Sequence, residues 1–317
     1  MSGRARLLIA AAVLIAASVP ARAAQAYVRS VSNVQKQLKW SSSCETVTIY
    51  LNGFTAMTPD EVAKSIGAAA AAWGPDSVTC PAEMGDGGNG HPYFEILPQL
   101  ATGGSVPDIT HPDGKNSIVF ETTNWDGPPD AFAYTAVSKE PGGRIIEADI
   151  AINASPGFGF EWANLDPGAP SGGHLPPVDL QTVMTHEFGH FIGLAHTCVT
   201  TTSGAGDDEN DGPQSGTDYL GQPIPSCYDT GVPQFAAVMW ATIDDGSSAK
   251  RVLSTDDARG VCAIYPSALD PHACTQNLPD DGCGCATAGA PSDRLAAVAL
   301  AALVLVALRR RRRMRRN

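Results

Sequence analysis

The sequence predicts an α+β fold with a mixed, twisted sheet of about five strands and three main helices, stabilised by disulfides. Three observations lead to this prediction. Most of the strand-like segments come before the second and third helical segments, which favours α+β over a regular alternation of strands and helices. The helical segments carry clear capping signals, and six cysteines lie in the same part of the chain.

Five segments have the β-branched and apolar character of strands and are bounded by turn-forming residues. They are residues 46–51, 93–97, 117–120, 132–137 and 145–152. Long connections rich in Gly, Pro and Asp separate several of the predicted elements, at 81–92, 101–114, 156–178 and 200–234.

The first predicted helix has a well-defined start and stop. Thr58 can cap it, Pro59 suits its first position, and Glu61 completes a Thr-x-x-Glu capping box. The helix is expected to run through a series of alanines to Trp73 and to end at Gly74.

Two further helices are predicted towards the end of the chain. One begins near Asp179, has the sequence LQTVMTHEFGHFI and ends at Gly193. The other follows Ser254 in STDDARGVCAIY, with Asp257 able to complete a second capping pair. Both segments carry apolar residues that predict a buried side.

The first 26 residues have the order of a secretory signal peptide. Arg4 and Arg6 precede a short apolar run, and small residues follow up to Ala26. We expect cleavage after Ala26, with Ala23 as the alternative. A membrane anchor is disfavoured because the apolar run is too short to span a bilayer comfortably.

Cysteine usage agrees with export, because an exported protein seldom keeps many free thiols. The six cysteines of the body are Cys44, Cys80, Cys198, Cys227, Cys262 and Cys274. Six cysteines allow fifteen pairings, among which sequence alone does not choose. Their order along the chain favours bonds between neighbours, namely 44–80, 198–227 and 262–274.

The body of the chain is strongly acidic once both ends are set aside. Residues 27–290 contain 10 of the 21 Lys and Arg residues but 32 of the 33 Asp and Glu residues, so their net charge is about −22. Such a charge excludes nucleic acid as a partner on electrostatic grounds. It favours a solvated surface with carboxylate-rich loops.

Three of the seven histidines fall within the segment THEFGHFIGLAHT, residues 185–197. His186 and His190 are four residues apart, so on a helix they project side by side and can bind one metal ion. Gly193 permits a left-handed turn that brings His196 round as a third ligand. Three neutral imidazoles leave the fourth tetrahedral position open for water, as catalytic zinc requires.

Glu187 follows the first of these histidines, and its carboxylate can reach a water on the metal. We therefore predict that Glu187 is the catalytic base. The pattern His-Glu-x-x-His-x-x-Gly-x-x-His fixes five residues, so a chance match arises at about one in ten million positions. The segment predicts one catalytic Zn(2+) per chain.

This segment resembles that of the metzincin zinc endopeptidases, and within them the matrixins. The resemblance extends from about Leu38 to Pro266. FAYTAV and IIEADIAIN resemble the matrixin strands before the active-site helix, and LSTDDARGVCAIY resembles the third helix. The family also implies a methionine turn, which AAVMWAT supplies with Met239, whose thioether would form an apolar floor beneath the imidazoles.

Several features depart from the matrixin pattern. Ala241 and Ile243 stand where matrixins usually have proline and tyrosine, so the resemblance does not define the wall of the specificity pocket. No His-x-Asp loop for a second, structural zinc occurs around 138–146, and no cysteine-switch propeptide separates the signal from the domain. The four remaining histidines are interpreted as surface residues: His91, His111, His174 and His272.

An acidic segment, GDDENDGPQSGTDY, lies between Cys198 and Cys227. It imitates part of a twelve-residue calcium loop, although Asp replaces the usual final Glu and no flanking helices are apparent in the sequence. A solvated acidic loop is the favoured interpretation, and Ca(2+) binding is the alternative. The candidate calcium ligands are Asp207, Glu209, Asp211 and Asp218.

About the last thirty-five residues resemble the MYXO-CTERM sorting signal. A Gly-Cys-Gly-Cys motif at 282–285, an apolar stretch at 295–308 and an arginine cluster at 309–316 follow one another in the order of that signal. The resemblance implies transient membrane contact, processing near the cysteines and display on a bacterial cell surface. An ordinary C-terminal transmembrane anchor is the alternative, because the arginines also fit a positive-inside stop.

These segments define four regions: a signal peptide at 1–26, a matrixin-like zinc metallopeptidase domain at 27–267, a linker at 268–288 and a sorting tail at 289–317. We expect an exported zinc metalloendopeptidase that binds protein or peptide substrates in extended form along residues 132–137. A zinc amidase acting on cell-wall crosslinks is one alternative. A surface protein that keeps zinc without turnover is another, against which the intact Glu187 argues.

Overall fold

The computed structural model of the chain describes residues 27–84, 90–166, 175–199, 216–243 and 246–274. The chain divides into two units, Met1–Gln276 and Asn277–Asn317, and every described residue belongs to the first. The predicted signal peptide and sorting tail lie outside the described residues. Within the described ranges, no helix is both long and apolar enough to cross a membrane.

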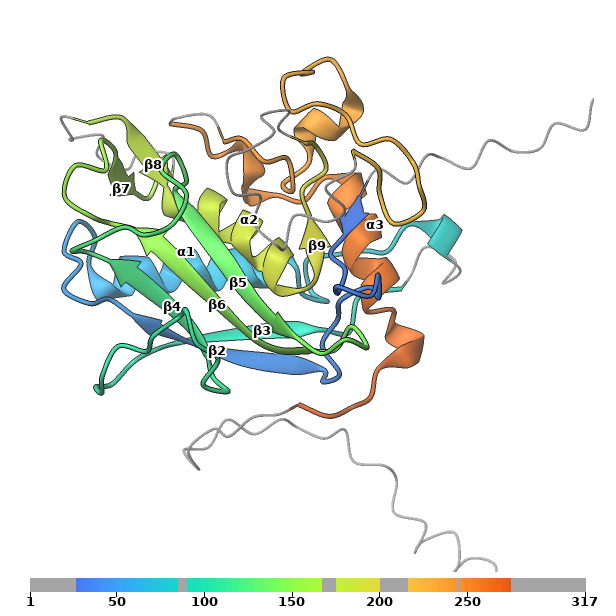
Figure 1. Cartoon of the computed structure of the whole chain (residues 1–317), viewed down its shortest axis with the longest axis horizontal. Helices are drawn as coiled ribbons and strands as arrows, with labels where there is room; N and C mark the ends of the chain where they lie inside the picture. Colours follow the sequence, from blue (N-terminus) through green and yellow to red (C-terminus); the bar gives the residue numbers. More distant parts are fainter. Residues whose placement is uncertain (1–26, 85–89, 167–174, 200–215, 244–245, 275–317) are drawn as a thin grey trace, which may run out of the picture. The chain divides into compact units, whose positions relative to one another are not determined.

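A five-stranded mixed sheet forms the centre of the domain, in the order β3-β2-β4-β6-β5 (Figure 1). Strand β5 is antiparallel to β6, and the other neighbouring strands are parallel. The predicted α+β class with a mixed sheet is therefore confirmed, and β5 lies at one edge. The strands are β2 (Cys44–Tyr50), β3 (Glu95–Leu100), β4 (Asn116–Glu121), β5 (Ala133–Lys139) and β6 (Ile145–Asn153).

The three predicted helices are present as α1 (Pro59–Ala72), α2 (Leu180–Phe191) and α3 (Thr255–Ile264). Helix α1 begins with the predicted capping box between Thr58 and Glu61. Helix α3 begins with a second capping box, which pairs Ser254 with Asp257. These reciprocal bonds satisfy backbone N–H groups that a helix start leaves without partners.

One apolar core lies between the sheet and the two helices α1 and α2. Val62 and Ile66 of α1, Val183 and Phe188 of α2, and Ile150 of β6 are each at most 1% exposed. Burying a side chain of this size contributes about 1.5–3 kcal/mol. Helix α2 is therefore anchored to the sheet on both sides of position 186.

Shorter elements complete the described part of the domain. The two-stranded pairs are β1 (Val28–Arg29) with β9 (Leu194–Ala195), antiparallel, and β7 (Glu161–Ala163) with β8 (Pro177–Asp179), parallel. The 3-10 turns are η1 (Ala82–Met84), η2 (Pro233–Ala236), η3 (Ala249–Arg251) and η4 (Ser267–Leu269). Figure 1 shows β1 and β9 side by side, so the start of the domain lies next to the segment that follows α2.

Three disulfides connect the predicted cysteines, but two of the three expected pairings are wrong. The bond between Cys198 and Cys227 is as predicted. The others join Cys44 to Cys274 and Cys80 to Cys262. The end of the described chain returns beside the start of β2, and α3 lies near the residues that follow α1, so neighbours in sequence are not neighbours in space.

The N-terminus of α2 is fixed by a buried ion pair. Asp179 caps the helix by accepting the backbone N–H of Thr182 at 2.9 Å, and Arg251 binds the same carboxylate at 2.5 and 2.7 Å. Burial would raise the pKa of the Asp179 carboxyl, but these bonds outweigh it and the pKa lies below its usual value. The carboxylate is therefore ionised at the positive end of the helix dipole, where it is stabilised.

The C-terminus of α2 is fixed by side chains that bind its last carbonyl groups. Trp40 donates its indole N–H to the carbonyl of Phe191 at 2.8 Å, and the hydroxyl of Tyr265 donates to that of Ile192 at 2.9 Å. Such carbonyls have no partner within the helix itself. Helix α2 is thus held at both ends, which limits its freedom to rotate.

Candidate metal centre

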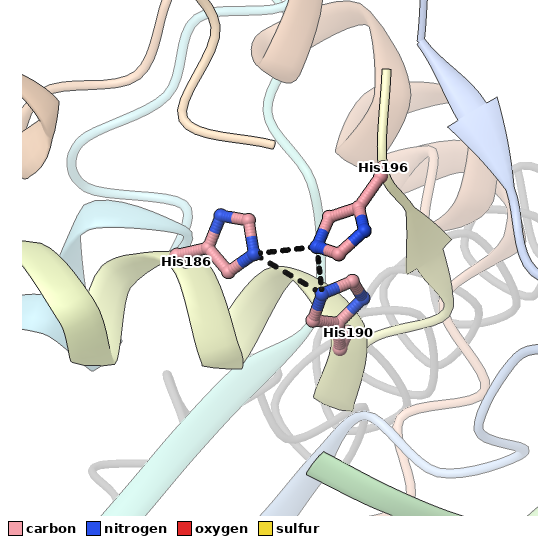
Figure 2. Close-up of side chains that lie close together, drawn as sticks. All are labelled: His186, His190 and His196. Atoms are coloured by element: carbon pink, nitrogen blue, oxygen red, sulfur yellow. Dashed lines mark hydrogen bonds between the residues drawn. The ribbon is translucent and has the colours of Figure 1, made fainter. Parts of the chain in front are cut away.

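Helix α2 places His186 and His190 one turn apart, and both imidazoles are buried. The helix ends two residues before Gly193, whose φ is 98°. A Cβ at this position would lie 2.6 Å from the carbonyl oxygen of Leu38, so the turn requires glycine for both its conformation and its space. Strand β9 follows, and His196 then faces the helix (Figure 2).

The Nε2 atoms of the three histidines face one another, and the dashed lines in Figure 2 join them in pairs. His186 and His196 are 3.0 Å apart at these atoms, and His190 lies 3.2 Å from the first and 3.1 Å from the second. The Nδ1 atoms of His186 and His190 lie 2.7 and 3.0 Å from the carbonyl oxygens of Val238 and Leu194. Because a carbonyl only accepts, both Nδ1 atoms carry the proton and both Nε2 atoms present lone pairs.

Lone pairs that face one another at this separation repel unless a cation lies between them. Zinc–nitrogen bonds are about 2.0–2.1 Å long, which places nitrogens at tetrahedral angles about 3.3 Å apart. The observed separations of 3.0–3.2 Å are close to this value. Within the described residues, these histidines are the one group of three or more His, Cys, Asp or Glu with ligand atoms within 4.8 Å of one another. The donor set therefore fits one zinc ion.

The charge state of His186 also suits a metal. Burial lowers the pKa of His186 well below its usual value, and the neighbouring imidazoles of His190 and His196 lower it further. His186 is therefore neutral near pH 7, and the neutral imidazole is the form that binds metal ions.

Met239 lies against the helix that carries two of the histidines. A Cβ at Gly189 would lie 2.1 Å from the sulfur of Met239, so the thioether packs directly on α2 between positions 186 and 190. Asp257 of α3 accepts the backbone N–H groups of Val238 and Met239 at 2.9 and 3.2 Å. The carbonyl of Val238 orients His186. Helix α3 therefore supports the metal centre by holding the backbone of Val238 and Met239.

Glu187 is buried and is held by a residue of the edge strand. The hydroxyl of Thr135 in β5 donates to Oε2 of Glu187 at 2.6 Å and lies 3.3 Å from its carbonyl oxygen. On a helix, Glu187 and His190 are three residues apart and lie on neighbouring positions of one side. The Glu187 carboxylate is therefore bound to the edge strand, and its backbone belongs to the helix that carries His186 and His190.

Two residues of this centre, Gly189 and Thr135, are absent from the sequence prediction. Glycine inside a helix costs about 1 kcal/mol relative to alanine, so Gly189 carried a local signal of close packing. Thr135 carried none, because its partner lies 52 positions away in the sequence. Contacts of this kind follow from the tertiary fold alone.

The remaining candidate residues do not join the metal centre. Asp207, Glu209, Asp211 and His174 lie outside the described residues. Asp218 is buried and accepts the backbone N–H groups of Leu220 and Gln222, at 2.8 and 2.7 Å, so its carboxylate organises a turn. His91, His111 and His272 are exposed. Calcium binding at the acidic segment stays a prediction.

A protein-family comparison matches the part of the chain that carries the histidines. The family model, described as pregnancy-associated plasma protein-A and named Peptidase_M43, covers residues 177–233. This range includes α2, the turn at Gly193 and His196. It is less than half of the chain, so the match concerns the centre rather than the whole domain.

Two individual proteins are similar to parts of the chain. Extracellular metalloprotease 1 of Coccidioides posadasii (strain C735) is 32% identical over 111 residues, which are 33% of this chain and 40% of that protein. The chain thus spans about 40% of the length of this curated relative. The hatching-enzyme zinc-protease high choriolytic enzyme 1 of Oryzias latipes is 12% identical, with a TM-score of 0.33 over 75% of this chain and 98% of that one. At this TM-score the likeness supports no conclusion.

The geometry and the sequence matches agree on the class of site, which is a three-histidine zinc centre of the metalloprotease type. Three imidazoles, a glycine turn and a methionine packed on the helix come together there. The narrower resemblance to matrixins stays a prediction, because the matching family model is a different one.

Proposed function

We propose that this chain is a zinc metalloendopeptidase that hydrolyses internal peptide bonds. The observation that carries the proposal is the convergence of three imidazole Nε2 atoms, together with the buried Glu187 that directly follows the ligand His186 on helix α2. A site that served structure alone would need a fourth protein ligand and no such base. The match to a metallopeptidase family over residues 177–233 supports the same conclusion.

His186, His190 and His196 would hold the zinc, which supplies Lewis acidity that activates water and polarises a carbonyl group. Glu187 accepts the proton of the attacking water and then delivers it to the leaving nitrogen. Carbonyl groups of Val238 and Leu194 keep two of the imidazoles in the tautomer that binds metal.

We propose that the substrate binds in extended form along β5. This strand is the last of the five-stranded sheet and lies beside α2, to which Thr135 connects it. An extended peptide can add to such an edge through backbone hydrogen bonds. The matrixin-type resemblance of residues 38–266 favours the same mode of binding.

Cleavage-site mapping tests this function against its alternatives. The purified protein, with zinc present, is incubated with a proteome-derived peptide library and separately with purified bacterial cell-wall material. Cleavage at internal bonds of many peptides, abolished by a chelator, is expected. Fragments released from wall material alone would favour the zinc amidase, and cleavage of neither would favour a surface protein without turnover.

We further propose that the protein is exported and displayed at the cell surface after removal of its tail. The three disulfides of the described residues support an oxidising location, and the curated relative bears the name of an extracellular enzyme. Mass spectrometry of the surface protein from its native host is expected to find Tyr27 first and a C-terminus before Leu295. An intact Asn317 on the surface form would favour a plain membrane anchor.

A further inference from the structure

Thr135 occupies a position that links the proposed substrate strand to the proposed base. Its side chain is 4% exposed, and its hydroxyl lies 2.6 Å from Oε2 of Glu187. The hydroxyl donates, and the carboxylate oxygen accepts. A separation of 2.6 Å lies at the short end of the range for a hydrogen bond between a hydroxyl and an oxygen acceptor.

The backbone N–H and C=O groups of Thr135 lie in the plane of the sheet and point towards its outer edge. The N–H of Asn153 in β6 donates to the carbonyl of Phe132 at 2.9 Å, and Thr135 is paired with Ile150 three positions further along. In an antiparallel pair, hydrogen-bonded and non-hydrogen-bonded positions alternate. Counting from Phe132, the N–H and C=O groups of Thr135 are directed away from β6.

A general base needs its carboxylate within about 2.6–3.2 Å of the proton that it removes. The terminal torsion of a glutamate side chain is broad, so packing of its stem does not by itself fix the carboxylate plane. A displacement of 1 Å can cost about 10²-fold in rate. A strong hydrogen bond to one carboxylate oxygen removes this freedom.

We propose that Thr135 is a positioning residue that orients the Glu187 carboxylate relative to a peptide bound along β5. The inference rests on the proposed peptidase function. The backbone of Thr135 lies at the edge where the peptide would pair, and its hydroxyl binds the carboxylate of Glu187. Substrate and base are therefore placed by one residue, on one strand of a rigid sheet.

Thr135→Val tests this role, because valine keeps the shape of the side chain and lacks the hydroxyl. With a quenched peptide substrate, kcat is expected to fall about 10- to 100-fold, while KM stays within about twofold and zinc content stays near one per chain. Thr135→Ser, which restores the hydroxyl, should bring kcat back to within a few-fold of the wild type. Thr135→Ala replaces the valine variant if that protein does not fold.

Thr182→Val is the matched control. Its hydroxyl donates to the buried carboxylate of Asp179 at 2.7 Å, on the same helix as Glu187. The control is expected to lower the melting temperature, as loss of a buried hydrogen bond does, and to leave kcat of the folded protein unchanged. If Thr135 had a merely structural role, its valine variant would behave like this control, with a lower melting temperature and an unchanged kcat.

A crystal structure of the zinc-bound Thr135→Val protein supplies a readout that does not depend on turnover. The Glu187 carboxylate is expected to rotate or to occupy two conformers. A kcat within twofold of the wild type, or an unmoved carboxylate, would overturn the inference. If the wild type cleaves no peptide, the proposed function fails, and the crystal structure alone then decides the role of Thr135.

Discussion

Replacement of Glu187 by glutamine is expected to lower turnover by about 10²–10⁴-fold without loss of fold or zinc. The amide has nearly the size and shape of the carboxylate, so it fits the same buried space. It lacks a basic oxygen of the required strength and does not carry a proton from water to the leaving nitrogen. The comparison is made from kcat on a quenched peptide, with zinc content and melting temperature measured on the same preparations.

Glu95→Gln provides the control for this experiment. Glu95 is exposed and lies in β3, the strand at the opposite edge of the sheet from β5. This variant makes the same change of net charge and should retain wild-type kcat and zinc content. Near-native turnover by the Glu187→Gln protein would show that the base lies elsewhere.

The regular elements of the fold could be predicted from sequence because their signals are local. The capping residues Thr58 and Ser254 lie where the helices begin, and each forms its expected reciprocal pair. All five predicted strands are present, with ends that differ by at most three residues from the prediction. Strand ends depend on pairing partners, which a sequence pattern does not contain.

Elements defined by distant contacts were not predicted. Strand β1 exists because Val28 and Arg29 pair with Ala195 and Leu194, more than 160 positions away. Neither β1 nor β9 has a sequence pattern that would predict a strand. Two of the three disulfide pairings were wrong for the same reason, since Cys44 and Cys274 are 230 positions apart and meet through the path of the chain.

The metal centre shows the same division between local and distant signals. His186 and His190 lie on α2, and His196 follows the short strand β9 within six residues of His190, so their spacing alone predicted that they would meet. The groups that orient them come from elsewhere, since Val238 lies 52 positions after His186 and is itself held by α3. Spacing therefore predicts the ligands, and only the fold shows what holds them in place.

His190→Ala is expected to abolish stable zinc binding. His190 contributes the Nε2 atom that lies 3.2 Å from that of His186 and 3.1 Å from that of His196. Loss of an outer-shell partner already lowers metal affinity about 10- to 100-fold, and loss of a direct ligand costs more. The zinc content of the purified protein, measured by metal analysis, should fall from about one zinc per chain to well below that value.

Stability provides a second measure of the same change. A bound metal stabilises the folded state by about 4 kcal/mol when its free concentration is 1,000 times the Kd. A chelator should therefore lower the melting temperature of the wild type and leave that of the His190→Ala protein almost unchanged. His111→Ala is the control, because His111 is exposed and lies outside the centre, so its zinc content and chelator response should match the wild type. Full zinc occupancy in the His190→Ala protein would contradict the assignment of the three ligands, since two imidazoles would then suffice to hold the ion.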